Sequence, residues 1–313
     1  MKRAIVFPGQ GSQVVGMGKD LAAAFLPARL VFEEVDDTLG QKLSHIIFEG
    51  LEVDLTLTEN AQPAIMASSM ALLRVLEKET GFNLSTYASY VAGHSLGEYT
   101  ALCAVGTFSL SDTARLLKLR GQAMQKAVPV GEGAMAAILG LEFAQVEEVV
   151  KEASAFGICA IANDNSPGQI VISGATDAIN KASELAKAKG AKRALLLPVS
   201  APFHSPMMQP AAQAMKEALA NTTLNTPSLP LIANVTASAV HDTSVIRGLL
   251  VEQVTGMVRW RESIHVLAIK GVTSALEIGV GKVLSGLIKR IEKDMETTCI
   301  ASAQDIETFS RGI

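Results

Sequence analysis

The chain has 313 residues, of which 49% are apolar, so it can bury a large core and form about two domains of ordinary size. Its net charge of -4 argues against nucleic acid as a partner, and no apolar stretch approaches the ~20 residues that cross a bilayer, so we expect no membrane contact. Three cysteines without C-x-x-C spacing favour neither a disulfide framework nor a metal site. Only four apolar residues stand between Arg3 and Pro8, too few for a signal peptide, so we expect a cytoplasmic protein.

The first element is a short apolar run at residues 4–7, which ends in the sequence PGQG. Glycines directly after a strand allow a ligand or a reacting atom to approach the backbone closely. A dinucleotide-binding fingerprint would need glycine in place of Val14, and a P-loop would need a Gly-Lys-Ser/Thr ending that this stretch lacks. The turn is therefore predicted either to serve another kind of ligand or to be a tight turn that faces solvent.

Helical spacing with breaks follows from about Gly18 to Glu79. Within it, Asn60 is predicted to be the N-cap of a helix, because Pro63 suits a first helical turn. A second capped helix is predicted over residues 109–128, which end just before a proline.

Between these helices, the sequence GHSLG at residues 93–97 matches the G-x-S-x-G pattern of a nucleophile elbow. The preceding residues favour a strand and the following ones a helix, which predicts a sharp turn at Ser95 with its hydroxyl exposed. Ser95 is therefore predicted to be a nucleophile, and the alternative is a plain glycine-rich turn. Glu98 lies in the first helical turn, where a favourable interaction with the helix dipole competes with any catalytic role.

Attack by a serine on an acyl carbonyl creates an oxyanion, which needs two preorganised N–H donors. One donor is the residue after the nucleophile, here Leu96, and the other comes from a loop on a neighbouring strand. The early turn Gly9-Gln10-Gly11 can supply that second N–H, and its glycines let a substrate approach the backbone. This prediction gives the first turn of the chain a function.

Arg120 is unusual because it stands in the apolar stripe of the second predicted helix. An inward-facing guanidinium needs an anion, since an unpaired buried charge is costly, and its planar fork suits a carboxylate. The anion is either a substrate carboxylate or an internal Asp or Glu, and the spacing leaves both open. The neighbours of Arg120 at three and four residues are Leu116, Leu117, Ala123 and Met124.

From residue 133 the pattern changes to six short elements in the order β-α-β-β-α-β, which is the ferredoxin-like order. We predict an inserted small domain at residues 130–198 and a discontinuous larger domain at residues 1–129 and 199–313. Further strands are expected at PLIANV and SALEIG. The six elements are AMAAILG, FAQVEEVVKEASAFG, ICAIAN, QIVISGA, DAINKASELAKAKG and AKRALLLPVS.

A basic run lies near the end of this unit, and it either forms a solvated face or attracts an acidic partner. Its members are Lys181, Lys187, Lys189, Lys192 and Arg193, set against Glu184.

A serine nucleophile needs a base, and five histidines are available. His94 adjoins the serine, and on such a turn its side chain points away from the serine hydroxyl. His45 and His265 fall in helical segments, and His241 lies in a polar loop. His204 follows a strand and lies in the irregular loop APFHSPMM, as the histidine of hydrolase-like sheets does. His204 is therefore predicted to be the base, and the alternative is an exposed loop histidine.

With these residues in place, the sequence resembles the malonyl-CoA:acyl carrier protein transacylases over essentially its whole length. This resemblance implies an α/β fold with an α/β-hydrolase-like large domain and an inserted ferredoxin-like (βαββαβ) small domain. The motifs that carry it are FPGQGSQ, QPA, AGHSLGEYTAL, RLLKLRGQAM, GAMAAILGL, NSPGQIVISG, KRALLLPVSAPFHSPMM and EIGVGKVLSGLIKR.

The resemblance implies that Ser95 carries the acyl group, that His204 is the base and that Arg120 pairs with the malonyl carboxylate. Backbone N–H groups of Gln10 and Leu96 are implied as the oxyanion hole. Four more positions are implied on the same basis. The backbone carbonyl of Gln253 orients the histidine, Asn163 and Gln169 line the path of coenzyme A and phosphopantetheine, and Phe203 accompanies malonyl rather than branched acyl groups.

The implied reaction moves a malonyl group from malonyl-CoA to the phosphopantetheine thiol of acyl carrier protein by a ping-pong route, and it needs no metal or cofactor. Two alternatives stay open: a related acyltransferase of a polyketide pathway, and a serine hydrolase on the same scaffold. The missing triad acid and the inward Arg120 count against the hydrolase. A non-catalytic carrier-binding subunit would lack Ser95 or His204, and both are present.

Overall fold

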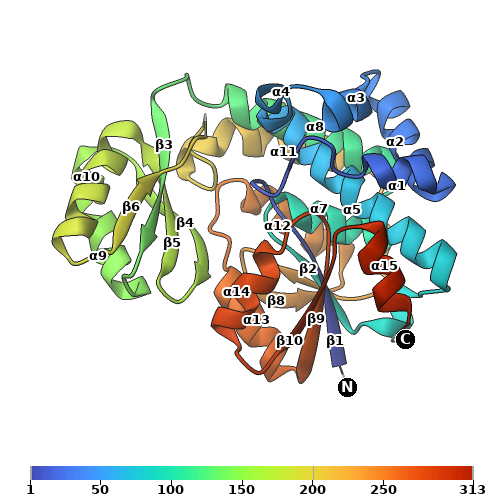
Figure 1. Cartoon of the computed structure of the whole chain (residues 1–313). Coiled ribbons are helices and arrows are strands. Elements are labelled where there is room, and N and C mark those ends of the chain that lie inside the picture. Colours follow the sequence, from blue (N-terminus) through green and yellow to red (C-terminus); the bar gives the residue numbers. More distant parts are fainter. Residues whose placement is uncertain (1, 200, 312–313) are drawn as a thin grey trace.

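The computed structural model describes residues 2–199 and 201–311, and it has two sheets with helices packed against both (Figure 1). The larger sheet has six strands in the order β10-β9-β1-β2-β7-β8. Its strands pair in parallel except β8, which runs antiparallel to β7 and makes the sheet mixed. They are β1 (Lys2–Phe7), β2 (Tyr90–Gly93), β7 (Leu231–Ala233), β8 (Ser238–Val240), β9 (Val272–Ile278) and β10 (Glu296–Ile300).

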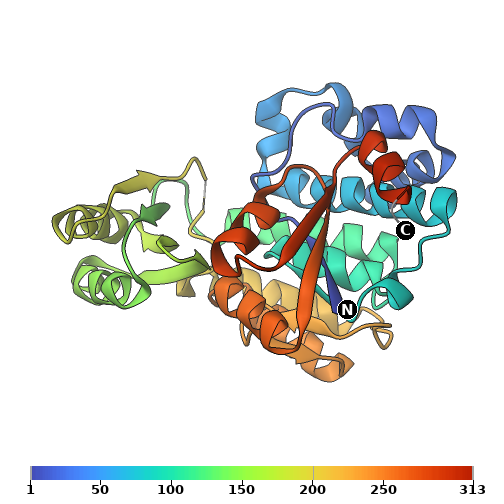
Figure 2. The same ribbon diagram turned by 60° about the horizontal axis from the view of Figure 1, so that its bottom comes forward.

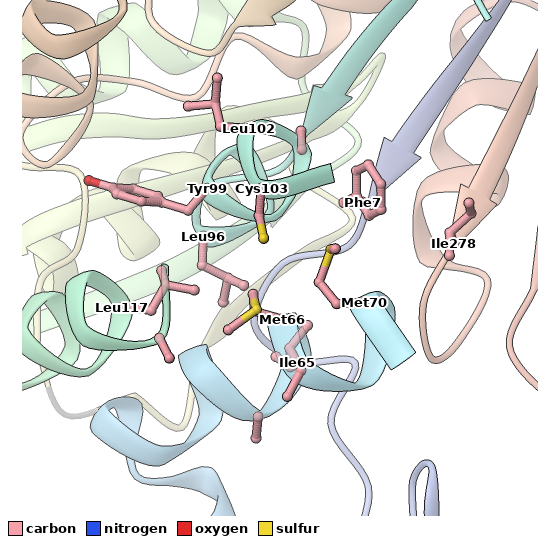
Figure 3. Close-up of a cluster of buried hydrophobic side chains, with 14 of the residues drawn as sticks. Phe7, Ile65, Met66, Met70, Leu96, Tyr99, Leu102, Cys103, Leu117 and Ile278 are labelled. Carbon is pink, nitrogen blue, oxygen red and sulfur yellow. The ribbon is translucent and has the colours of Figure 1, made fainter. Parts of the chain in front are cut away.

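Helices cover both faces of this sheet because its central strand is apolar on both sides. Ile5 and Phe7 of β1 pack into one core cluster with α5 (Thr58–Thr80), α7 (Leu96–Ala104) and α8 (Leu110–Lys126). Figure 3 shows part of that cluster, in which Phe7 faces methionines of α5 and residues of α7. The alternate residues of β1 enter a second cluster with α13 (Trp260–Ile269) and α14 (Val283–Ile291).

The remaining helices surround these two layers, and the C-terminal one lies beside the N-terminal ones (Figures 1 and 2). They are α1 (Lys19–Ala24), α2 (Leu26–Leu39), α3 (Leu43–Glu49), α4 (Glu52–Thr56), α6 (Leu84–Tyr87), α11 (Gln209–Ala220), α12 (Thr243–Gln253) and α15 (Ala303–Ser310), with single 3-10 turns at Ser154–Phe156 and Pro206–Met208. No helix in the described part of the chain is both long and apolar enough to span a membrane.

The second sheet projects to one side of the first (Figures 1 and 2). Its strand order is β4-β5-β3-β6, all pairs are antiparallel, and two helices pack with it around a third core cluster. The six elements predicted here therefore form in the predicted order. They are β3 (Gly133–Leu139), α9 (Phe143–Ala153), β4 (Cys159–Ser166), β5 (Gln169–Ala175), α10 (Thr176–Ala188) and β6 (Arg193–Leu196). Of the ranges assigned to the two domains, residues 1, 200 and 312–313 lie outside the described residues.

A short seam of hydrogen bonds joins strand β4 to Val258, in the segment that precedes α13. Val258 donates its N–H to the carbonyl oxygen of Ala162 at 2.8 Å and accepts from Asp164 at 3.0 Å. The Asp164 carboxylate is buried and pairs with the Arg261 guanidinium, at 2.9 Å from Nε and 2.8 Å from Nη2. These contacts fix β4 beside the carboxyl ends of β1 and β2, where the candidate site lies.

Candidate active site

Ser95 stands on a strained turn between β2 and α7, with φ of 55°. A Cβ on Gly93 would lie 1.9 Å from the Gly97 carbonyl oxygen, and one on Gly97 would lie 2.3 Å from the Phe7 carbonyl oxygen. Only glycine fits at both positions. The strained backbone is held from both sides, because the Ser95 N–H donates to Asn234 Oδ1 at 2.8 Å and Gln253 Nε2 donates to the Ser95 carbonyl at 2.9 Å.

The structure brings His204 to the serine, with Nε2 at 2.8 Å from Ser95 Oγ. The other ring nitrogen, Nδ1, lies 2.9 Å from the backbone oxygen of Gln253 and 3.1 Å from that of Gly256. Carbonyl oxygens only accept hydrogen bonds, so Nδ1 carries the proton and Nε2 is free to accept one from the serine. Burial, and next the nearby charge of Arg120, lower the pKa of His204 to about 3, which keeps the imidazole neutral.

The other histidines of the described chain do not contact the serine hydroxyl. His94 points away from it, as predicted, and its Nε2 lies 2.8 Å from Asn165 Oδ1. Burial lowers the pKa of His94. His265 pairs with Glu292 on the far side of the sheet, and His45 lies near Glu49 on α3. Local sequence context therefore selected the histidine that lies beside Ser95.

Arg120 faces inward from α8 and is 1% exposed. Its Nη1 donates to Gln62 Oε1 at 2.7 Å, and its Nη2 donates to Gln253 Oε1 at 2.9 Å and to Ser95 Oγ at 3.1 Å. Every one of these acceptors is uncharged. The buried Nε finds no acceptor among the described residues, and burial lowers the pKa of the group. The internal ion pair that the sequence left open is therefore not formed within the described chain, and Glu98 acts on the charge of Arg120 only from across the Gln253 amide.

Gln253 connects the base, the arginine and a buried carboxylate. Its amide nitrogen donates to Glu98 Oε2 at 2.5 Å, which leaves its amide oxygen for Arg120. The second oxygen of Glu98 accepts the backbone N–H of Asn234 at 3.2 Å. Burial raises the pKa of Glu98 to about 7, against these hydrogen bonds, which lower it. Glu98 thus lies behind the site and does not touch the serine hydroxyl.

Gln10 and Leu96 belong to two turns that line the same cavity. Strands β1 and β2 are parallel neighbours with Phe7 opposite Gly93, so the turns that follow them meet at one edge of the sheet. Gly9 packs so closely that a Cβ there would lie 2.6 Å from the His94 carbonyl oxygen. Within the described chain, the backbone N–H groups of Gln10 and Leu96 find no acceptor, so both remain available to a ligand.

A cavity of about 310 Å³ opens over the serine, and its wall includes both turns, Arg120 and His204. Phe203 and Asn163 also line it, and both are nearly buried. Gln169 does not line this cavity; its side chain accepts a hydrogen bond from Arg290 Nη1 at 2.8 Å at the junction of the two sheets. The structure therefore gathers the predicted residues around one pocket, except Gln169 and the buried Gln253 behind it.

Two polar residues of the site carried no prediction of their own. Gln62 holds Arg120 across 58 positions of sequence, and Asn234 holds the Ser95 backbone across 139. Both are buried amides. The sequence feature that could have identified them is an Asn or Gln at the end of a strand or among apolar helix residues, because a buried amide needs hydrogen-bond partners inside the protein.

Comparison with known proteins agrees with this geometry. A sequence model of the acyl transferase domain family matches residues 4–305. The malonyl CoA-acyl carrier protein transacylase of Bacillus subtilis is 46% identical over 98% of this chain and 95% of its own length, and that of Escherichia coli K12 is 43% identical over 92% of each.

Solved structures give the same result. An acyl-carrier-protein S-malonyltransferase from Bartonella henselae superposes with a TM-score of 0.97 at 57% identity, covering all of both chains. A malonyl-transacylase solved in complex with a type II polyketide synthase acyl-carrier protein superposes with a TM-score of 0.96 at 40% identity, again over all of both chains. A strained serine, a neutral histidine and a buried arginine thus share one pocket in a chain that belongs to the acyl transferase domain family.

Proposed function

We propose that the chain transfers the malonyl group of malonyl-CoA to the phosphopantetheine thiol of acyl carrier protein, through a malonyl ester on Ser95, and so supplies fatty-acid synthesis. One observation carries this proposal: the Ser95–His204 pair shares its pocket with a buried guanidinium whose acceptors are all uncharged. A thioester with a free carboxylate fits this pocket, because the thioester reacts with the Ser95–His204 pair and the carboxylate binds the guanidinium. The names of the relatives, which are malonyl CoA-acyl carrier protein transacylases, support the same reading.

The reaction follows a ping-pong order with His204 active in both halves. Nε2 of His204 accepts the proton of Ser95 Oγ while Oγ forms a bond to the thioester carbon. The tetrahedral intermediate then breaks its C–S bond, and the coenzyme A sulfur leaves with that proton. In the second half the pantetheine thiol gives its proton to His204 and attacks the ester, and Ser95 Oγ leaves and takes the proton back.

The backbone N–H groups of Gln10 and Leu96 stabilise the oxyanion in both tetrahedral intermediates. Removing one such donor from an acyl-transfer enzyme typically costs on the order of a hundredfold to a thousandfold in rate. Their support here is that both residues line the cavity and that neither backbone N–H has an acceptor among the described residues.

Arg120 holds the malonyl carboxylate, and Gln62 and the Gln253 side chain hold Arg120. Phe203 closes the pocket beside the base and excludes a branch on the acyl group, and Asn163 borders the path of the pantetheine arm. The carbonyl oxygen of Gln253 takes the place of a triad acid, because it fixes the tautomer of His204 without adding charge. No metal or cofactor enters these steps.

For the architecture we propose an α/β-hydrolase-like catalytic domain at residues 1–129 and 199–313 and a ferredoxin-like small domain at residues 130–198. The supports are the elbow between β2 and α7 and the separate four-stranded sheet with its own core. Three cysteines, none in a disulfide, are consistent with a cytoplasmic location.

A second candidate, malonyl transfer in a polyketide pathway, is favoured by the similarity to the polyketide malonyl-transacylase. The pocket chemistry is the same in both pathways, so only the carrier protein separates them. A serine hydrolase of uncharged esters has no use for a buried arginine beside its nucleophile, and His204 has a carbonyl oxygen in place of a triad acid, so both features count against that alternative.

Intact-protein mass spectrometry tests the proposal. Incubation with malonyl-CoA is expected to add one malonyl group, and carrier protein in its phosphopantetheine form is expected to remove it. Ser95→Ala should gain no adduct, and His204→Ala should acylate more slowly by a factor on the order of a hundred to ten thousand. A malonyl adduct on Ser95→Ala, or an adduct that carrier protein cannot discharge, would refute the proposal.

A further inference from the structure

We propose that Arg120 restrains the nucleophile in the free enzyme and that a carboxylate in the pocket removes this restraint, so the acyl group that is to be transferred activates Ser95 itself. The inference rests on the proposed function and deepens it. It assigns a specificity role to the Arg120–Ser95 contact and predicts that small free carboxylates bind at the same place.

The donors of Arg120 can be counted. A guanidinium has five N–H groups, and three are used, one by Gln62, one by Gln253 and one by Ser95. The contacts to the two glutamines are 2.7 and 2.9 Å long and hold the group from both sides. The contact to Ser95 Oγ, at 3.1 Å, is the longest of the three. It is therefore the contact that a competing anion displaces first.

Two donors remain free, the second N–H of Nη1 and the N–H of Nε, and Nε points to how a carboxylate binds. Nε is buried, lacks an acceptor among the described residues and shares one edge of the guanidinium plane with Nη2. A carboxylate on that edge forms two parallel hydrogen bonds, one from each nitrogen. Both Nη2 donors are already in use, and we infer that the carboxylate displaces the longer of the two contacts, which is the one to Ser95 Oγ.

The effect on the serine follows from its lone pairs. Ser95 Oγ donates its proton to His204 and accepts from Arg120, so one of its two lone pairs is bound to a cation. Attack on a carbonyl carbon needs a lone pair of Oγ, and the hydrogen bond from Arg120 engages one of them. When the carboxylate takes that donor, both lone pairs are available as the proton leaves for His204.

A carboxylate in the pocket also makes His204 a stronger base. The charge of Arg120 is the second cause, after burial, of the lowered pKa of His204. A carboxylate that neutralises this charge makes the imidazole a better proton acceptor. An acetyl group brings no carboxylate and leaves both effects in place, so selectivity against it arises in the rate of acylation and not only in binding.

The test separates the carboxylate from the acyl group. Acylation of the wild-type protein by acetyl-CoA is measured in single turnover by intact mass, with increasing formate, with formamide as the neutral isostere and with sodium chloride at matched ionic strength. We expect formate to accelerate acetylation saturably, on the order of tenfold, and formamide and chloride to have no effect. Formate should at the same time inhibit acylation by malonyl-CoA competitively, because both carboxylates occupy one place.

Arg120→Ala completes the test, because the variant should acetylate without restraint and show no response to formate. Absence of formate acceleration in the wild-type protein, or acceleration that persists in Arg120→Ala, would overturn the inference. The wild-type measurement decides even if the variant is unstable. Malonylation of Ser95 without formate is the separate readout of the proposed function, so the two ideas can fail independently.

Discussion

At the scale of single residues, the site combines side chains that local sequence patterns predict with side chains that only distant contacts bring in. Ser95 and His204 were predictable, because a strand-to-helix turn and a loop after a strand are local patterns. Arg120 was predictable as inward-facing, but its partners were not. Gln62 is 58 residues away in sequence from its partner Arg120, and Asn234 is 139 residues away from its partner Ser95. Local residue spacing does not predict contacts between such distant positions.

Phe203 carries a prediction at this scale. Its ring lines the cavity directly beside His204 and is 8% exposed. Truncation in Phe203→Ser should admit a branched acyl group, because a pocket that fits a substrate closely discriminates about 10- to 200-fold per methylene group. We expect the ratio of kcat/KM for methylmalonyl-CoA to that for malonyl-CoA to rise about tenfold. Phe156→Ser is the matched control, since Phe156 is 55% exposed. An unchanged ratio in Phe203→Ser would place the selectivity elsewhere in the pocket.

At the scale of elements, helix and strand positions were largely predictable and their ends less so. The helix predicted to begin at Asn60 begins at Thr58, and Leu57 is its N-cap. The prediction was wrong because the Asn60 side chain serves tertiary contacts: it donates to the Asp54 carbonyl and accepts from Gln41. Strand order in both sheets depends on contacts between distant segments, and the sequence pattern does not contain it.

Gly121 carries the element-scale prediction, because it sets the distance between α8 and α5. A Cβ there would lie 2.5 Å from Glu59 Cα and 2.7 Å from the Thr58 carbonyl oxygen, and both are backbone atoms that cannot move alone. Gly121→Ala should push the helices apart, lengthen the contact between Arg120 and Gln62, and cost about 1 to 3 kcal/mol of stability. Malonyl transfer should fall with it.

Gly286→Ala in α14 is the matched control, because its added Cβ meets no atom within 4 Å. That change should leave activity intact and stabilise the protein by about 0.4 to 1 kcal/mol. Thermal melting and malonyl transfer are measured for both variants. Equal melting temperatures for the two would show that close helix packing at Gly121 does not matter.

At the scale of the whole molecule, we predict that an acidic carrier protein docks near the four-stranded sheet. In the basic run of this sheet, Lys181 pairs with Glu184 and Lys189 with Glu148. Lys192 and Arg193 are exposed at the edge strand β6, which leads directly to residues 197–199 of the cavity wall. We therefore expect Lys192 and Arg193, rather than the paired Lys181 and Lys189, to attract an acidic carrier protein.

Charge reversal tests this surface. Lys192→Glu with Arg193→Glu should raise the KM for carrier protein and weaken its salt dependence, because opposite charge mainly raises the association rate. Acylation by malonyl-CoA in single turnover should not change. The control reverses two exposed lysines on the larger unit, Lys78 and Lys293. If both double variants behave alike, the carrier protein docks elsewhere.

The central claim is that the pocket is built for an acyl group with a free carboxylate, and Arg120→Ala tests it most directly. The measurement is kcat/KM for malonyl-CoA and for acetyl-CoA, with the melting temperature of both proteins. Removing one partner of a buried charge pair typically costs about 2 to 5 kcal/mol, so malonyl transfer should fall steeply while acetyl transfer holds or rises. Lysine should restore only part of the loss, because an ammonium lacks the two-pronged fork. Equal losses for both substrates together with a lowered melting temperature would contradict the account and make Arg120 a structural residue.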